Sequence, residues 1–203
     1  MAKSPYGARS KLVSIPAPIA GWNARDAKSE MGKTDAVVLD NFIPDAGGVQ
    51  QRRGKAAHAT ALTGNFVESL MEYSSPSASP KLFAGLPGII YEVTAASAGV
   101  STITGLTNGR WQHTMFATPG GHFLVLCNGA NSVLNYDGTS WTFPAITGVT
   151  SSTLINVCAH MSRLWFIQSA TLKVWYLPSQ SIAGAATAID FAPICKHGGE
   201  LFL

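Results

Sequence analysis

The chain has 203 residues, of which 46% are hydrophobic and only 12% are charged, and its formal net charge is +3. This length allows one large domain, or one domain with an arm, and it is sufficient to bury a core. The charged share is about half of that in typical soluble domains, which suits a subunit whose faces are covered by neighbours. A β-rich domain with a Ser, Thr and Gly surface explains it equally well. The slight net charge disfavours sequence-specific DNA reading, because DNA-binding domains concentrate positive charge on one face.

Three widely spaced cysteines, Cys127, Cys158 and Cys195, form no CxxC pair. We therefore expect buried free thiols in a reducing compartment and no metal site. The N-terminal sequence LVSIPAPIAG is broken by prolines, which argues against a signal peptide. No apolar stretch reaches the roughly 18 to 20 residues of a membrane span. We expect a soluble protein that is made in a cytoplasm.

Residues 1–33 are predicted to form an extended N-terminal arm. They contain Pro5, Pro16 and Pro18 among scattered Gly, Ser and charged residues, a composition that becomes ordered only when something binds it. Trp22 belongs to this arm. A large aromatic side chain there can anchor the arm in a pocket of a neighbouring subunit.

Residues 34–65 are predicted to form a connector with one short helix and a strand. Thr34 or Asp35 can cap the helix. Pro44 ends it, because proline disfavours helical geometry in the residue before it. The residues expected on one side of this helix are Val38, Leu39 and Phe42. The sequence VQQRRG that follows reads as a short strand with a solvated end.

Residues 66–203 contain a repeat. Apolar segments of similar pattern begin at Leu82, Phe123 and Leu164, so that two successive intervals are both 41 residues long. Each segment is preceded by one strand-like run and followed by another. Four short antiparallel strands in about 41 residues are the content of one β-propeller blade. Runs such as FLVLC and LWFI are apolar on both faces, as strands stacked between neighbouring sheets must be.

The predicted fold is therefore mostly β: a propeller-like array of about three four-stranded antiparallel blades, with an extended arm and one short helix before it. A β-sandwich is the rival architecture, but sandwiches do not require a constant period. Asp137-Gly138 supplies the backbone conformation of a tight hairpin. Closed propellers have about four to eight blades, so either other subunits complete the ring or the chain belongs to a longer product. We expect the latter, because a strand is beginning in KHGGELFL.

No residue pattern typical of catalysis is present in the sequence: GxSxG, HExxH, the Walker loop and GxGxxG before a helix are all missing. Glu68 and Glu72 are expected to be solvent-facing strand charges, not the paired carboxylates of a glycosidase. His113 and His160 hold similar places in successive repeats, but a third metal ligand is lacking. We expect no catalytic residue, no cofactor and no metal, and conclude that the chain is not an enzyme.

Residues 21–54, GWNARDAKSEMGKTDAVVLDNFIPDAGGVQQRRG, resemble the opening of a family of tailed-phage and prophage structural proteins. The elements of this resemblance are Gly21-Trp22-Asn23, Asp35-Ala36, Leu39-Asp40-Asn41-Phe42, Pro44 and Arg53-Gly54. The blades, with NYDGTSW, are similar to the propeller portions of these proteins. The resemblance implies a component of a short phage tail, similar to tail nozzle or tail tube proteins. Such subunits form a ring, often hexameric, below the portal and adaptor, and DNA passes through the channel without sequence-specific binding. This chain is shorter than most members.

On this interpretation the protein is a homo-oligomeric virion protein of the tail, synthesised in the host bacterial cytoplasm, with the portal, the adaptor and other tail proteins as partners. The residues expected at the subunit interface are Trp22, Asn23, Arg25, Leu39, Phe42, Arg52 and Arg53. The alternative is a propeller-type carbohydrate- or receptor-binding module of the virion that uses aromatic side chains such as Trp141 and Trp175. A tail glycan hydrolase acting through Glu68 is a third hypothesis.

Overall fold

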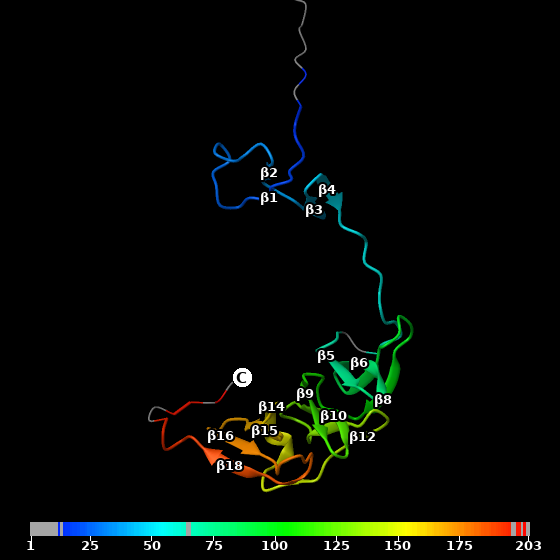
Figure 1. Ribbon diagram of the computed structural model, residues 1–203, viewed down its shortest axis with the longest axis vertical. Coiled ribbons are helices and arrows are strands. Elements are labelled where there is room, and N and C mark those ends of the chain that lie inside the picture. Colours follow the sequence, from blue (N-terminus) through cyan, green and yellow to red (C-terminus); the bar gives the residue numbers. More distant parts are fainter. Residues whose placement is uncertain (1–11, 13, 64–65, 196–197, 200, 202–203) are drawn as a thin grey trace, which may run out of the picture. The chain divides into compact units, whose positions relative to one another are not determined.

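The computed structural model describes residues 12, 14–63, 66–195, 198–199 and 201. Contacts within the chain divide it into two units, Met1–Ala56 and Ala57–Leu203. Both are built from strands joined by turns and loops (Figure 1). This division differs from the predicted boundaries after residues 33 and 65. In the part of the chain that is described, no helix has the length and apolar character to cross a membrane.

The second unit contains three four-stranded antiparallel sheets, each with its strands in chain order. Sheet 1 consists of β5 (Ser69–Ser75), β6 (Ala78–Leu86), β7 (Ile89–Glu92) and β8 (Val100–Thr104). Sheet 2 consists of β9 (Gln112–Thr118), β10 (Gly121–Cys127), β11 (Leu134–Tyr136) and β12 (Trp141–Thr142). Sheet 3 consists of β14 (Leu154–His160), β15 (Arg163–Gln168), β16 (Lys173–Tyr176) and β18 (Thr187–Asp190). These strands confirm those predicted from the repeat.

Two short elements lie between and beside these sheets. Strands β13 (Ile146–Thr147) and β17 (Gly184–Ala185) pair in parallel. The segment η1 (Ser151–Thr153) is a single turn of 3-10 helix just before β14. It is the only helical segment among the described residues, so the chain is mostly β, as predicted.

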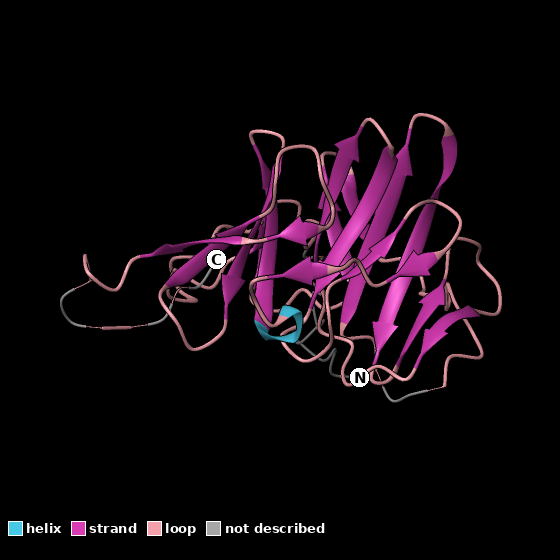
Figure 2. Cartoon of the chain, turned by 90° about the horizontal axis from the view of Figure 1, so that it is seen from below, coloured by secondary structure: helices cyan, strands magenta, loops and turns pink. Residues whose placement is uncertain are grey.

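Sheet 2 is buried on both faces because it lies between the other two sheets (Figure 2). Its side chains alternate between the two cores, as the pleat of a strand requires. The buried residues of the core between sheets 1 and 2 are Met71, Tyr73, Phe83, Ile90, Leu106, Trp111, Leu124, Leu126, Leu134 and Tyr136. Those of the core between sheets 2 and 3 are Phe116, Val125, Cys127, Val133, Leu154, Val157, Leu164, Phe166 and Leu177. The prediction that FLVLC is covered on both faces is confirmed.

The equal spacing of 41 residues locates the strands but not equivalent side chains. Leu82 lies on the face of sheet 1 that points away from sheet 2, in a cluster with Ala84. Phe123 and Leu164 both pack in the core between sheets 2 and 3, from opposite sides. Because neighbouring side chains of a strand point to opposite faces, a match between strands that is off by one residue reverses the face. The residue-by-residue match of the repeat is therefore wrong.

Residues of the first unit form two separate strand pairs. Strands β1 (Gly21–Trp22) and β2 (Asp35–Ala36) pair in parallel, and β3 (Phe42–Asp45) and β4 (Gly48–Gln51) form an antiparallel hairpin. The strand predicted within VQQRRG is confirmed by β4. Of the predicted arm, residues 1–11 and 13 lie outside the described residues.

The short helix predicted after Thr34 does not form. Asp35 and Ala36 instead form strand β2, and the Asp35 carboxylate accepts from Asn23 and from the N–H of Gly32, which precedes it. Asn41 has a φ of 61°, outside the helical region. Val38 and Phe42 are exposed. Helices in proteins are stabilised mainly by packing an apolar face, and these side chains have no surface in this unit to pack against.

Candidate interaction surfaces

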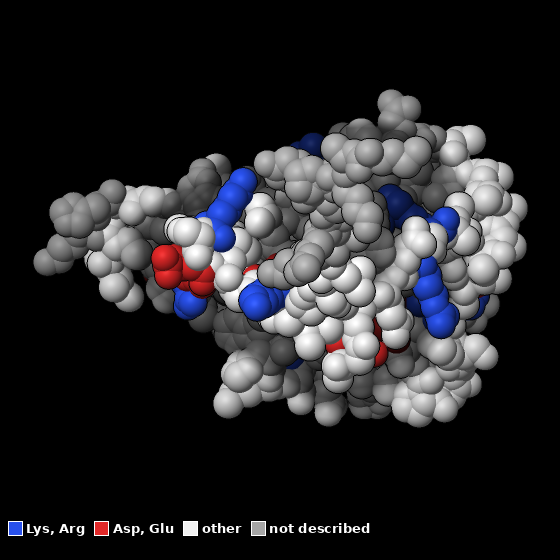
Figure 3. Space-filling view, turned by 90° about the horizontal axis from the view of Figure 1, so that it is seen from above, with Lys and Arg blue, Asp and Glu red and all other residues white. Residues whose placement is uncertain are grey.

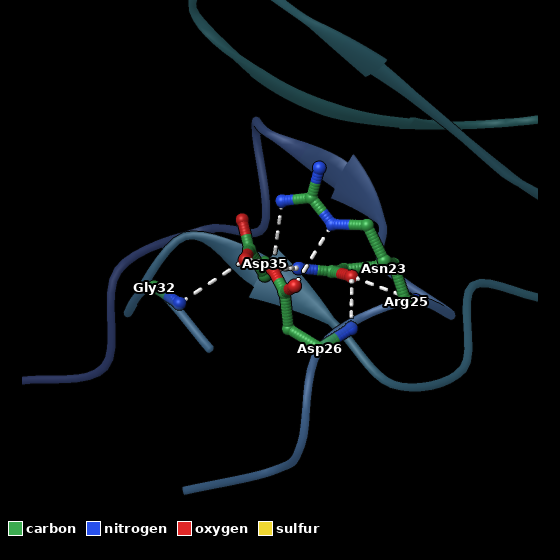
Figure 4. A network of polar contacts seen from close by, with 5 residues as sticks. All are labelled: Asn23, Arg25, Asp26, Gly32 and Asp35. Carbon is green, nitrogen blue, oxygen red and sulfur yellow. Dashed lines mark hydrogen bonds and ion pairs between the residues drawn. The ribbon is translucent and has the colours of Figure 1, made fainter. Parts of the chain in front are cut away.

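Asn23 organises a polar network in the first unit (Figure 4). Its Nδ2 donates to the carboxylates of Asp26 and Asp35, at 2.9 and 2.8 Å. Its Oδ1 accepts from the backbone N–H groups of Arg25 and Asp26, at 3.0 and 3.1 Å. An Asn side chain that accepts from the backbone two and three residues later forms an Asx turn. Asn23 therefore fixes both its own turn and the approach of the second strand.

Charge strengthens this turn on its exposed side. The Nε of Arg25 donates to the Oδ1 of Asp26 at 2.8 Å. Bonds from Arg25 first, and from Asn23 second, lower the pKa of the Asp26 carboxyl below its ordinary value. Asp35, across the network, accepts a further bond from Gly32 N–H at 3.1 Å. The two carboxylates thus share the amide of Asn23 as a donor, and each has a further donor of its own.

Three of the elements that carry the phage-tail resemblance lie side by side within this unit. Gly21 and Trp22 pair with Asp35 and Ala36 in β1 and β2. Gly21 has a φ of 88°, and a Cβ there would lie 3.6 Å from the ring of Pro44. The 3.6 Å separation is an ordinary van der Waals distance, so it is the positive φ that favours glycine at this position. The spacing of these elements in the sequence therefore corresponds to a local fold.

The predicted interface residues occupy one exposed and weakly packed unit. Trp22 is 68% exposed, and its Nε1 donates to the carbonyl of Val37 at 3.1 Å. Trp22 and Leu39 line one shallow hollow of about 360 Å³. Asn23 and Arg25 belong to the network above. The remaining three, Phe42, Arg52 and Arg53, are exposed on or just after the β3–β4 hairpin.

Glu68 has a structural role that its sequence context did not suggest. Its side chain is only 8% exposed. Its carboxylate accepts from Gly109 N–H at 2.6 Å and from the Nε of Arg110 at 3.1 Å. Ser69 donates to the carbonyl of Gly109 at 2.6 Å. Glu68 was expected to face solvent, and instead it ties the start of sheet 1 to the loop before sheet 2. Glu72 is exposed, as expected.

His113 and His160 do not lie at equivalent positions. His113 is the second residue of β9, whereas His160 is the last residue of β14, so the expected equivalence of their positions is wrong. Burial lowers the pKa of His113 below the ordinary histidine value. Within the described part of the chain, no group of three or more His, Cys, Asp or Glu side chains is placed to hold a metal ion.

The three cysteines differ in burial. Cys127 is buried in the core between sheets 2 and 3, and burial raises the pKa of its thiol far above the ordinary value. Cys158 is exposed and Cys195 is half-buried. All three are free thiols, but only one is a buried residue, so the prediction of buried thiols fails for the other two.

Charged side chains are few and dispersed. On the face shown in Figure 3, Lys and Arg side chains are separated by uncharged surface, with Asp and Glu among them. In a protein that binds nucleic acid, basic side chains are instead expected to cluster on one face. This agrees with the low charge of the sequence.

No second sheet of the described residues covers the outer face of sheet 3, yet Ile167 on this face is only 4% exposed, and Trp165 and Val174 are half-buried. This outer face carries a hollow of about 390 Å³. The residues lining it are Asn156, Cys158, His160, Trp165, Phe166, Ile167, Val174, Phe191 and Leu201. No Lys, Arg, Asp or Glu is among them. Of the run LWFI, Leu164 and Phe166 are buried against sheet 2 and Ile167 is buried on the other face, whereas Trp165 is half-buried, so burial on both faces is confirmed for three of the four residues.

A second hollow of similar size lies between the outer strands of sheets 1 and 2. Lys81 and Glu92 form an ion pair there, with Nζ and Oε2 3.2 Å apart. Tyr136 and Trp141 also line the hollow, and their rings pack at 4.9 Å between centroids. The Nε1 of Trp141 is buried without a hydrogen-bond partner. This hollow therefore combines aromatic and polar groups.

No protein-family model matches this chain, and no curated protein matches it.

Proposed function

We propose that this chain is a structural subunit of a short phage tail, similar to tail nozzle or tail tube proteins. In this role several copies form a ring below the portal and the adaptor, and DNA passes through the channel of the ring. The resemblance implies that the ring is hexameric. The observation that carries the proposal is the convergence of the resemblance-bearing elements. Gly21-Trp22 and Asp35-Ala36, separated by twelve residues, pair as β1 and β2 and share the network of Asn23.

The arrangement of the second unit supports the same role. The first strand of sheet 2, β9, contacts the first strands of both other sheets, β5 and β14, and β10 also contacts β5 and β14. Contact between the inner strands of successive four-stranded sheets is typical of propeller blades. We therefore propose that the three sheets are propeller-like blades. Their function is to present surfaces to companions and not to hold a substrate.

The first unit supplies a surface for assembly. Of its described residues only Gly21 and Ala36 are buried, so it lacks an apolar core of its own. Large apolar side chains such as Trp22, Val38 and Ile43 are exposed. Exposed apolar side chains that gather in one place are common at protein–protein contacts. We propose that this unit binds a neighbouring subunit in the tail.

The test is assembly. Native mass spectrometry and negative-stain microscopy of the purified chain are expected to show a ring with a central channel. The Trp22→Ala variant is expected to lose this assembly, whereas Val100→Ala, which removes an exposed side chain from sheet 1, is expected to keep it. A wild-type chain that stays monomeric, with residues 14–56 fully protected from proteases, would rule out the proposal.

Passage of DNA gives a second measurement. A conduit should bind DNA weakly and equally for all sequences, with an affinity that falls steeply as salt rises. Filter binding with two unrelated duplexes is expected to give the same affinity. A strong preference for one sequence would contradict a conduit.

The alternative function, a carbohydrate- or receptor-binding module, is favoured by the hollow of Tyr136, Trp141 and the Lys81–Glu92 pair. Saccharides bind to aromatic rings flanked by polar groups. A glycan array distinguishes this function from the first: glycan binding is measured for the wild type, for Trp141→Ala and for Trp175→Ala. Glycan binding lost in Trp141→Ala alone would favour this function over the first.

A further inference from the structure

We infer that residues 52–58, which we call the linker, form a processing site at which an endoprotease specific for Arg and Lys separates the two units of the chain. The expected scissile bonds are Arg53–Gly54 and Lys55–Ala56. The site is defined by the conformation and the side chains of the linker alone. Only its consequence for assembly rests on the proposed function.

The linker lies at the boundary between the two units, which falls between Ala56 and Ala57. Strand β4 ends at Gln51, and the ribbon then continues through residues 52–57 without a helix or a strand (Figure 1). Every residue of the linker is exposed. Exposed segments between compact units are the places where proteolytic cleavage concentrates, because few contacts hold them.

The backbone in the middle of the linker makes no hydrogen bonds. The N–H of Arg52 donates to the carbonyl of Asn41 at 2.7 Å, and a ring nitrogen of His58 lies 2.8 Å from the carbonyl oxygen of Val93. Between these anchors, the backbone groups of residues 53–57 have no partner among the described residues. An extended peptide that binds as an added strand uses its own N–H and C=O groups. Those of the linker can therefore pair with the cleft of a protease without first being released.

Basic side chains give the linker its specificity. Arg52, Arg53 and Lys55 are exposed, and none of them forms an ion pair with a described residue. No Asp or Glu occurs from residue 46 to residue 67. Proteases of the trypsin type hold a basic side chain in a pocket that contains a carboxylate. A free guanidinium or ammonium group can enter such a pocket without breaking an existing pair.

Small residues follow both expected cleavage positions. Gly54 follows Arg53, and Ala56 and Ala57 follow Lys55. Apart from its chain neighbours, no heavy atom lies within 4 Å of a Cβ added at Gly54. The space on the far side of the first scissile bond is therefore open to the approach of a protease.

The other basic residues of the described chain lie in more ordered surroundings. Lys28 and Lys33 are also exposed, but each lies in a turn closed by a backbone hydrogen bond, of 2.8 and 3.1 Å respectively. Arg25 and Arg110 form ion pairs with carboxylates. The remaining three lie within strands of sheets 1 and 3: Lys81, Arg163 and Lys173. The unpaired backbone of the linker, and not exposure alone, therefore distinguishes it from these positions.

Cleavage is the hydrolysis of one peptide bond. At the second position the C–N bond between Lys55 and Ala56 breaks, and water supplies a hydroxyl group to the carbonyl carbon and a proton to the nitrogen. Strand pairing survives on both sides, since every strand pair joins strands of the same unit. If the first unit binds a neighbouring subunit, as proposed above, cleavage removes the assembling unit from the three sheets.

Limited proteolysis of the purified full chain tests the site, with trypsin as the probe and mass spectrometry of the fragments as the readout. The first cut is expected after Arg53 or Lys55, and the three sheets are expected to remain in one resistant fragment. Cleavage there should be about tenfold faster than at Lys28 or Lys33, because those turns must open first. A first cut at either of these two lysines or within a sheet would overturn the inference. Cuts at basic residues outside the described part are recognised by fragment mass.

Matched variants separate recognition from accessibility. The triple variant of Arg52→Gln, Arg53→Gln and Lys55→Gln is expected to resist trypsin at the linker. The double variant of Lys28→Gln and Lys33→Gln is expected to be cut there at the wild-type rate. Subtilisin, which requires no basic residue, is expected to cut the linker of the wild type and of the triple variant alike. A wild-type linker that resists both proteases would overturn the inference.

Assembly is measured separately from cleavage. Arg53 is also one of the residues expected at the subunit interface, so a neighbour bound there can shield the linker. Trypsin cleavage is therefore compared in the wild type and in Trp22→Ala, which is expected not to assemble. A wild-type chain that is cut at the linker but forms no ring would contradict the proposed function and support this inference. A linker that resists trypsin in both chains would overturn it.

Discussion

The two units of the chain are stabilised by different interactions. In residues 57–203, two apolar cores lie between three sheets, and fully buried side chains come from all of them. In the described part of residues 1–56, only Gly21 and Ala36 are buried, and the fold depends on the hydrogen bonds of Asn23 and on short strand pairs. Apolar burial of about 25 cal/mol per Å² accumulates over a core, whereas each hydrogen bond adds only about 1 kcal/mol net.

This difference predicts separate stabilities. The second unit should unfold as one cooperative body, because its middle sheet contributes to both cores. The first unit should open locally at much lower free energy, since few apolar contacts oppose its opening. Substitutions in the two units should therefore be read with different probes, global unfolding for one and local exchange for the other.

The largest effect is expected for Phe83→Ala. Phe83 is fully buried and its ring meets those of Tyr136 and Trp141, each at 5.0 Å between centroids. Removal of a buried phenylalanine side chain costs about 3 to 5 kcal/mol, so the midpoint of urea unfolding of the second unit should fall sharply. Phe83→Leu, which keeps most of the volume, should cost far less. Equal losses in the two variants would mean that this core does not limit the stability of the unit.

A smaller loss is expected for Gly109→Ala. A Cβ at this position would lie 2.7 to 2.8 Å from backbone atoms of Gly85 and Leu86. Because those atoms cannot move without shifting sheet 1, the cost should be about 1 to 3 kcal/mol. Gly120→Ala is the control within the same unit, since the atom nearest to the added carbon, Oγ1 of Thr118, lies at an ordinary 3.5 Å. A neutral Gly109→Ala would show that the loop can move away from sheet 1.

The strands of the second unit could be predicted well from the sequence, because alternation and turn residues act locally. The Asp137-Gly138 turn is an example: Gly138 has a φ of 102°, and Asp137 accepts from the N–H groups of Thr139 and Ser140. The face of each residue could not be predicted from the interval alone. Register shifts interrupt the pairing near Tyr73, Ile90 and Leu154, and each shift changes the count of residues between equivalent positions.

The candidate surfaces were less predictable. The spacing of Asn23 and Asp26 is typical of an Asx turn, so this turn could be predicted from the sequence. In contrast, the bond from Asn23 to Asp35 joins residues far apart in the sequence, and no local pattern specifies it. The same holds for Glu68 and Gly109. In the sequence, a glutamate that is exposed on a strand cannot be distinguished from one whose carboxylate is buried under a loop, because only the folded structure determines where the loop lies.

Asn23→Ala should act on the first unit only. The substitution removes both donors that bridge the carboxylates of Asp26 and Asp35, and both acceptors of the turn. The free energy of local opening should fall by about 1 to 2 kcal/mol. Hydrogen exchange of the Trp22 and Ala36 amides should accelerate while the urea midpoint of the second unit stays constant. A shift of that midpoint would show that the two units unfold together.

The smallest effect is expected from the charge of Asp137. Bonds from the backbone of Ser140 first, and of Thr139 next, lower the pKa of this exposed carboxyl. A lowered pKa means that the folded chain holds the ionised form better than the unfolded chain does. Its contribution is therefore present above the ordinary value of about 3.9 and disappears as the pH falls through the lowered pKa.

Asp137→Asn isolates that contribution, because the amide oxygen can still accept from Thr139 and Ser140 while the charge is lost. Wild type should be slightly more stable than Asp137→Asn at pH 7, and the two should converge as the pH falls below about 4. Urea unfolding at a series of pH values measures the difference. A difference that persists unchanged at pH 2 would assign it to hydrogen-bond geometry in the β11–β12 turn, and not to the charge of the carboxylate.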